Sequence, residues 1–259
     1  VFSDTEWSLT NVYWKQLFRE GRLQFILGAV DPTDYVDMYG LTNPWTQFSN
    51  LVFLTDPTIP VPNQGLGAAF GAMATDHLYV LGGLADTNGD PTLPGEWFES
   101  FFDEQEYFYH LEIGWLASFD RRYFDNIHLT GWYADDRKNA LVESGKGLSF
   151  SGAWFVNDTW MPFLRAGYSD GGGALLEKTV SGGVGYYFKE SKDLAGFGLN
   201  WGRPPGSGLD DQYTAEIFYR LQLTQNLALT PDVQLIIDPA LNPQESSIWV
   251  FGLRARLTL

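Results

Sequence analysis

Ser247-Ile-Trp-Val-Phe-Gly-Leu-Arg-Ala-Arg-Leu-Thr-Leu259 forms the C-terminal stretch of this chain and alternates apolar with polar residues. In an extended strand, successive side chains point to opposite faces. One face of this strand is therefore unbroken and apolar, and it carries Trp249, Phe251, Leu253, Ala255, Leu257 and Leu259. A closed barrel in a lipid bilayer requires this pattern, because lipid covers its outside while water or polar groups fill its inside.

The same alternation recurs along the sequence. Residues 211–223 and 227–238 are two such runs, and the short stretch between them has the length of a hairpin turn. Further candidate strands lie at 7–18, 22–30, 66–74, 77–85, 107–115, 126–134, 147–156, 160–169, 178–188 and 194–202. The sequence thus predicts about thirteen strands of roughly ten residues, the length that a tilted strand needs to span a bilayer.

The connections between these runs alternate in length. Short ones lie near 19–21, 75–76, 157–158 and 224–226, and long ones at 31–65, 86–105, 135–146, 203–211 and 239–246. An up-and-down barrel shows this alternation because its periplasmic turns are short and its extracellular loops are long. Single-chain bacterial barrels have even strand numbers. An odd count therefore means either that a strand is miscounted or that strands upstream of Val1 are missing. We expect residues 1–259 to be one all-β, antiparallel barrel domain that lacks N-terminal strands.

The composition agrees with a membrane barrel. Aromatic residues make up 16% of the chain, which suits the aromatic girdles at the two membrane interfaces. Mean hydropathy is −0.17, and no window approaches the roughly eighteen apolar residues of a transmembrane helix, so a helical membrane protein is excluded. Cysteine is absent, which excludes disulfides and thiol chemistry. The net charge of −16 argues against nucleic acid as a partner.

Segment 31–65 is the longest connection. It carries the carboxylates Asp31, Asp34 and Asp37 and the aromatic residues Trp45 and Phe48. Its later part is rich in proline, which restricts the backbone. A loop of this length in a compact barrel is usually functional. We predict that the segment folds into the lumen and constricts the pore.

Several motifs resemble the OprB-type carbohydrate-selective outer-membrane porins. They are Gly28-Ala-Val-Asp31, Thr46-Gln-Phe48, Asp56-Pro-Thr-Ile-Pro60, Gly65-Leu-Gly-Ala68, Tyr213-Thr-Ala-Glu-Ile-Phe-Tyr-Arg220, Leu229-Thr-Pro-Asp-Val-Gln234 and Trp249-Val-Phe-Gly-Leu-Arg-Ala-Arg256. The resemblance spans residues 7–259 and implies a sixteen-stranded barrel, monomeric or trimeric, in the bacterial outer membrane. Such a barrel passes glucose and other small sugars by diffusion. This chain departs from the family pattern in its final residue, Leu259, which is not aromatic, and in about three missing N-terminal strands.

The predicted lumen contains polar and aromatic residues that a sugar could contact. They are Glu106, His110, Glu112, Trp132, Arg165, Glu216, Phe218, Arg220, Asp232, Arg254 and Arg256. One interpretation is an ion-pair ladder that braces the wall, with Arg254 opposite Asp232 to within two residues. The other is that charged groups bind sugar hydroxyls while Phe108, Trp132 or Phe218 offers a flat face to a pyranose ring. The two interpretations are compatible.

The constriction is expected to place Arg165, Arg220 and Arg254 opposite segment 31–65. A negative loop that faces a positive wall would set up a transverse field and order the water between them. Apolar solutes would have to displace this water, whereas sugar hydroxyls can replace its hydrogen bonds. We therefore expect Arg220 and Arg254 to control pore width and sugar selectivity.

Residues 86–106 hold seven carboxylates and neither lysine nor arginine. They predict a solvated extracellular loop or, alternatively, a loop that binds lipopolysaccharide through divalent cations. The stretch from Asp86 to Asp90 begins like a calcium loop, but Pro91 and Trp97 stand where its glycine and glutamate are needed. We expect no metal site and no cofactor. We also expect no catalysis, because a Ser–His–acid site needs a nucleophile within hydrogen-bond reach of the base, and His110 and His128, near Glu112 and Ser149, are better explained as polar lumen residues.

The expected partners are small sugars, outer-membrane lipopolysaccharide and phospholipid, and further copies of the chain in a homo-trimer. A soluble or surface all-β protein with a lectin-like role is the alternative. Two packed sheets would produce the same alternation, with their apolar faces buried against each other. The large number of strands with one unbroken apolar face favours the porin.

Overall fold

Thirteen antiparallel strands form one continuous sheet in the computed structural model, which describes residues 7–206 and 208–258. Each strand pairs with its sequence neighbours, so the topology is up-and-down. The strands are β1 (Val12–Phe18), β2 (Leu23–Val30), β3 (Gly65–Met73), β4 (Leu78–Asp86), β5 (Tyr107–Leu116), β6 (Asn126–Ala134), β7 (Gly145–Ala153), β8 (Trp160–Gly171), β9 (Lys178–Tyr187), β10 (Leu194–Arg203), β11 (Gln212–Gln222), β12 (Leu227–Ile237) and β13 (Ser247–Leu257). The predicted fold class is confirmed, and the strands lie where they were predicted, except that β1 begins at Val12 rather than at residue 7.

Helical structure is confined to the connections. It consists of η1 (Arg19–Gly21), η2 (Pro32–Asp34), α1 (Leu51–Leu54), α2 (Trp97–Glu99), η3 (Ser100–Glu104) and η4 (Phe119–Arg121). Within the described residues, no helix has the length and apolar character needed to cross a membrane.

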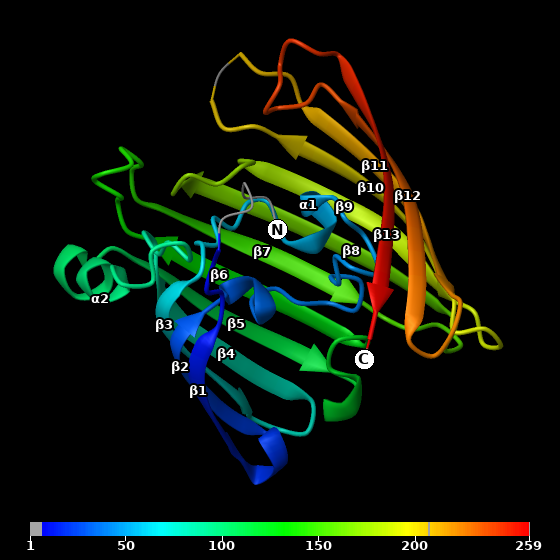
Figure 1. Ribbon diagram of the computed structural model, residues 1–259, viewed down its shortest axis with the longest axis horizontal. Coiled ribbons are helices and arrows are strands. Elements are labelled where there is room, and N and C mark those ends of the chain that lie inside the picture. The colour runs from blue at the N-terminus through cyan, green and yellow to red at the C-terminus, as the bar shows by residue number, and fades with distance from the viewer. Residues whose placement is uncertain (1–6, 207, 259) are drawn as a thin grey trace.

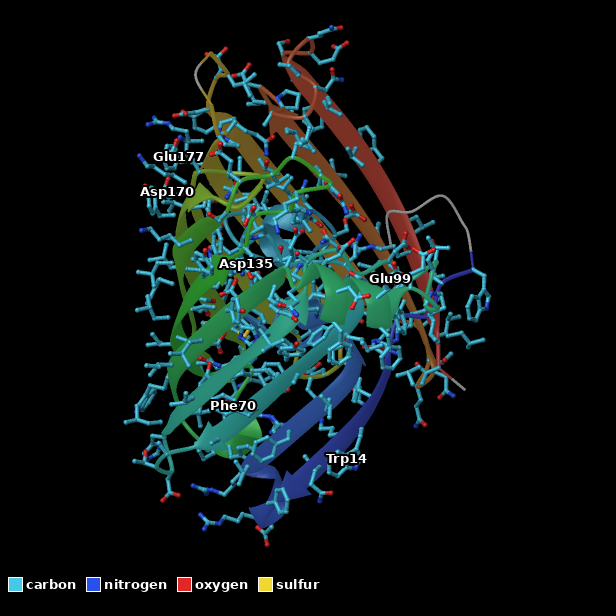
Figure 2. All side chains as sticks on the ribbon, turned by 90° about the vertical axis from the view of Figure 1, so that its left-hand side faces the viewer. Trp14, Phe70, Glu99, Asp135, Asp170 and Glu177 are labelled. Atoms are coloured by element: carbon cyan, nitrogen blue, oxygen red, sulfur yellow. The ribbon has the colours of Figure 1, made fainter. Side chains whose placement is uncertain are left out.

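The sheet is apolar outside and polar inside, the reverse of a soluble protein. On β5, the outward residues Leu111 and Ile113 are exposed, whereas His110 and Glu112 on the opposite face are buried. The outer apolar face continues over the other strands, and Figure 2 shows Trp14 and Phe70 on it. Such a surface is costly in water but suits lipid.

The two ends of the sheet differ. The end with the connections 19–22, 74–77, 117–125, 154–159, 188–193 and 223–226 is the turn end, and the other, with longer connections on average, is the loop end. The predicted alternation of short and long connections is therefore present. Acidic residues gather toward the loop end, where Figure 2 shows Glu99, Asp135, Asp170 and Glu177.

Residues 31–64, here called the inner segment, connect β2 to β3 and lie within the curl of the sheet (Figure 1). Most of the buried apolar side chains lie where this segment meets the wall. Because all strands belong to one sheet, the two-sheet sandwich of the lectin-like alternative is wrong. In the described part of the chain, β1 and β13 each pair with one neighbour only.

The register of the β12–β13 hairpin sets the positions of the C-terminal charged residues. Thr230 pairs with Arg254, and Asp232 pairs with Gly252. Asp232 is thus two residues from the position opposite Arg254, within the predicted range. Both side chains lie on the inner face, while Trp249 and Phe251 are 60% and 76% exposed.

Candidate functional site

The inner segment packs against the wall through two apolar clusters. In the first, the Phe48 ring lies 4.9 Å from Phe218 and 4.8 Å from Phe53, measured between centroids. In the second, Val36 and Ile59 cover Phe108, Trp132 and Ala134. Burial of each phenylalanine stabilises the docked segment by about 1.5–3 kcal/mol. Hydrophobic burial therefore holds the segment against the wall, as it does in a protein core.

Two glycines of the wall allow this close approach. A Cβ atom on Gly167 of β8 would collide with the hydroxyl of Thr58 and the carboxylate of Asp56. A Cβ on Gly198 of β10 would lie 2.7 Å from the ring of Phe53. The missing side chains therefore provide the space that the segment occupies.

A buried charged cluster joins the segment to β5, β6 and β8. Asp37 forms an ion pair with Arg165, and both side chains are 1% exposed. The other oxygen of Asp37 lies 3.0 Å from Nε2 of His128, and its backbone N–H donates to Glu112 over 2.9 Å. Burial opposes the charge of Asp37, but Arg165 and the hydrogen bond from His128 hold its pKa below the usual value.

A second polar cluster joins the segment to β11, β12 and β13. The backbone N–H groups of Ser49 and Asn50 donate to the two oxygens of Glu216 over 2.7 and 2.9 Å. The Ser49 hydroxyl also donates to Asp232 over 3.1 Å. Arg254 lies 3.2 Å from Asp232 and donates a hydrogen bond to the carbonyl of Pro44. Glu216 thus accepts hydrogen bonds from the two backbone donors just before α1.

The remaining predicted residues have other surroundings. Arg220 donates to the carbonyl of Lys192 at the turn end, and Arg256 is exposed on the edge strand β13. Glu106 accepts a hydrogen bond from Asn88 over 2.8 Å at the loop end. His110 is buried, and neither ring nitrogen has a hydrogen-bond partner in the described residues.

Asp31 and Asp34 of the inner segment do not contact the arginines. Asp31 caps η2 by accepting a hydrogen bond from the backbone of Thr33, and Asp34 accepts one from Asn11 over 3.3 Å. Both residues line a cavity on the face of the inner segment that turns away from the wall.

Two sequence-based interpretations need correction. Phe108, Trp132 and Phe218 are 0%, 4% and 1% exposed, so the inner segment covers the faces that were expected to meet a sugar. Arg165 does not face Asp37 across a water-filled gap, because the two groups touch. The wall that meets the segment also carries the carboxylates of Glu112, Glu216 and Asp232, so it is not uniformly positive.

Sequence reasoning did not include Ser49, Asn50, Asp56 or His128 among the site residues. Asp56 accepts a 2.7 Å hydrogen bond from Ser149 of β7, and burial raises the pKa of its carboxyl. The apolar residues of the long segment were the available signal that it packs against the wall, because a fully solvated loop is usually polar. Alternation along the strands predicted that partners such as Glu216 and Asp232 face inward, but it gave no sign that these residues of the segment bind them.

The face of the segment that turns away from the wall borders two open cavities. The upper cavity, of about 1360 Å³, reaches the loop end and is lined by Asp90, Glu96 and Glu104 among others. The lower cavity, of about 600 Å³, reaches Tyr123 and Phe124 in the β5–β6 connection. Trp45 lines both. The free face of the segment, rather than the covered wall, is therefore what a solute would meet.

Comparison with known proteins agrees with this architecture. The chain is similar in structure to OprB of Pseudomonas putida at high pH, with a TM-score of 0.71 at 16% identity over 96% of this chain and 73% of that one. The low-pH OprB structure gives a TM-score of 0.58 at 16% identity, over 97% and 67% of the two chains.

A mutant of Rh. blastica porin gives a TM-score of 0.51 at 12% identity, over 91% of this chain and 73% of that one. At these low identities, the TM-scores show that the fold is shared and nothing more. A search of curated proteins found no significant match. The family model of the carbohydrate-selective porins, OprB family, matches residues 1–259. The chain belongs to the OprB family of carbohydrate-selective porins.

Proposed function

We propose that the full-length protein is a channel in the outer membrane of a Gram-negative bacterium through which small neutral sugars such as glucose diffuse passively. The sugars pass along the free face of the inner segment, from the upper to the lower cavity. The observation that carries this proposal is the inverted sheet, apolar outside and polar inside, with a buttressed segment within its curl. The family match supplies the class of solute.

The same arrangement suggests how the channel sits in the membrane. The acidic loop end faces the cell exterior, and the turn end faces the periplasm. The outer wall contacts phospholipid and the acyl chains of lipopolysaccharide, and three copies associate through it as a homo-trimer. The inner segment acts as the constriction. The family match and the fold support a channel rather than an enzyme.

Liposome swelling with the full-length protein tests the proposal. Vesicles that contain the protein should swell in glucose faster than in a disaccharide, because the constriction excludes the larger solute. Empty vesicles and vesicles with heat-unfolded protein serve as controls. Equal swelling rates in all three preparations would contradict the proposed function.

A further inference from the structure

The lower cavity contains large apolar side chains that are exposed although they lie inside the curl of the sheet. Trp45 is 56% exposed, and it is the one large apolar side chain with that property in the inner segment, which the structure describes completely. Tyr123 and Phe124, in the connection between β5 and β6, are 45% and 37% exposed and line the same cavity. Exposed rings at this place are suited to contact a solute that has an apolar face.

The backbone around Trp45 is fixed rather than flexible. The backbone N–H groups of Thr46 and Gln47 donate to the carbonyl of Asn43 over 3.2 and 2.9 Å. The N–H of Trp45 donates to the Asn43 side chain over 3.0 Å, and Arg254 of β13 binds the carbonyl of Pro44. The backbone that carries the indole is therefore held in place before any solute arrives, which lowers the entropy cost of contact.

The polar groups of the lower cavity select the chemistry of the solute. Asp34 and Asn43 line it beside the rings and can exchange hydrogen bonds with hydroxyl groups. Its described lining residues include the carboxylates Asp31 and Asp34 and neither lysine nor arginine. An anionic solute would therefore be repelled. A neutral pyranose has C–H faces for the rings and hydroxyl groups for the polar rim.

We propose that Trp45, Phe124 and Tyr123 form an aromatic track on which neutral pyranose sugars stack in turn between the constriction and the turn end. This inference rests on the proposed function and names the residues that give it selectivity. The cavity of about 600 Å³ lies within the range of small-molecule sites, roughly 300–1,000 Å³. Contact with single rings is weak, as a pore requires, because a solute that binds tightly cannot leave.

Block of the ion current by glucose, recorded with the full-length protein in planar bilayers, measures contact with the track. Trp45→Ala and Tyr123→Ala should each raise the half-blocking concentration about three- to tenfold, the effect of losing one aromatic contact. Trp45→Phe retains a ring and should stay close to wild type. Trp249→Phe, on the outer face of β13, is the matched control and should not alter block. Glucuronate should block the wild type more weakly than glucose.

The outcomes separate the two proposals. If the wild type conducts ions but no sugar blocks it or passes through it, the proposed function fails. If glucose blocks the wild type and both alanine variants at the same concentration, the aromatic track is overturned while the channel function stands. Heat-modifiable migration of each variant shows that the barrel has folded, and Trp45→Phe separates loss of the ring from disturbance of the segment.

Discussion

At the scale of single residues, the buried charges serve mainly to fasten the inner segment. Glu216 accepts hydrogen bonds from two backbone N–H groups of the segment. Asp37 forms an ion pair with Arg165 and a hydrogen bond with His128. Alternation along the strands predicted that Glu216 and Arg165 point inward. It could not predict their partners, because Asp37 and Arg165 lie 128 residues apart and the conformation of the segment follows no period.

The Asp37–Arg165 pair offers a first prediction at this scale. Arg165→Met should lower the free energy of unfolding by about 3–5 kcal/mol, because it leaves the Asp37 carboxylate buried without its cation. The double variant Asp37→Asn with Arg165→Met should lose less than the sum of the two single variants. Guanidinium titrations of the four proteins give the coupling. Additive losses would mean that the pair does not act as a unit.

Arg254 and Arg220 should differ in their effect on the pore. Arg254→Ala removes the hydrogen bond to Pro44, next to Trp45, and should raise ion conductance and weaken discrimination between sugars and ions. Arg220→Ala removes a contact to Lys192 at the turn end and should leave both nearly unchanged. Single-channel recordings compare them directly. A larger effect of Arg220→Ala would restore the expectation that both arginines line the constriction.

At the scale of elements, the strands were predictable from the sequence, whereas the contacts that the inner segment makes with the wall were not. The period of two residues is visible in β5 and β13 because lipid and lumen impose opposite demands on neighbouring residues. The same period placed Phe218 on the inner face. It did not show whether water or protein would cover the ring, since that depends on where Phe48 comes to lie.

Docking of the inner segment should depend on Gly167. Gly167→Ala places a methyl group against Thr58 and Asp56, so the segment should move off the wall and become more sensitive to protease. Gly182→Ala on the adjacent strand β9 is the control, because its Cβ would meet no described atom closer than 3.7 Å. Limited proteolysis of the folded barrels compares the two. Equal cleavage rates would show that the wall tolerates the extra methyl group.

At the scale of the whole molecule, negative charge is concentrated at the loop end. The carboxylates near the upper cavity include Asp90, Glu96, Glu99 and Glu104, and the described lining contains one cation, Arg137. Composition predicted the excess of negative charge, −16 over the chain. Its place at the entrance follows from the topology, which brings the connections after β4 and β6 to the same end.

This distribution predicts a preference for cations over anions that weakens as salt rises. Replacing Glu96, Glu99 and Glu104 together by glutamine should reduce the potassium-to-chloride permeability ratio, most clearly at low ionic strength, where screening is weak. Glu190→Gln at the turn end serves as the control. Reversal potentials in a salt gradient give the ratio. No change in the triple variant would place the selectivity elsewhere in the channel.

The absence of a side chain at Gly167 also has a consequence for how this sequence can change over generations. The wall at that point and the turn around Thr58 are complementary surfaces encoded far apart in the gene. A larger residue at position 167 is tolerable only together with smaller or displaced residues at positions 56 and 58. Related sequences should therefore vary at these three positions in a correlated way, and an ancestor reconstructed with the change at position 167 alone should not tolerate it.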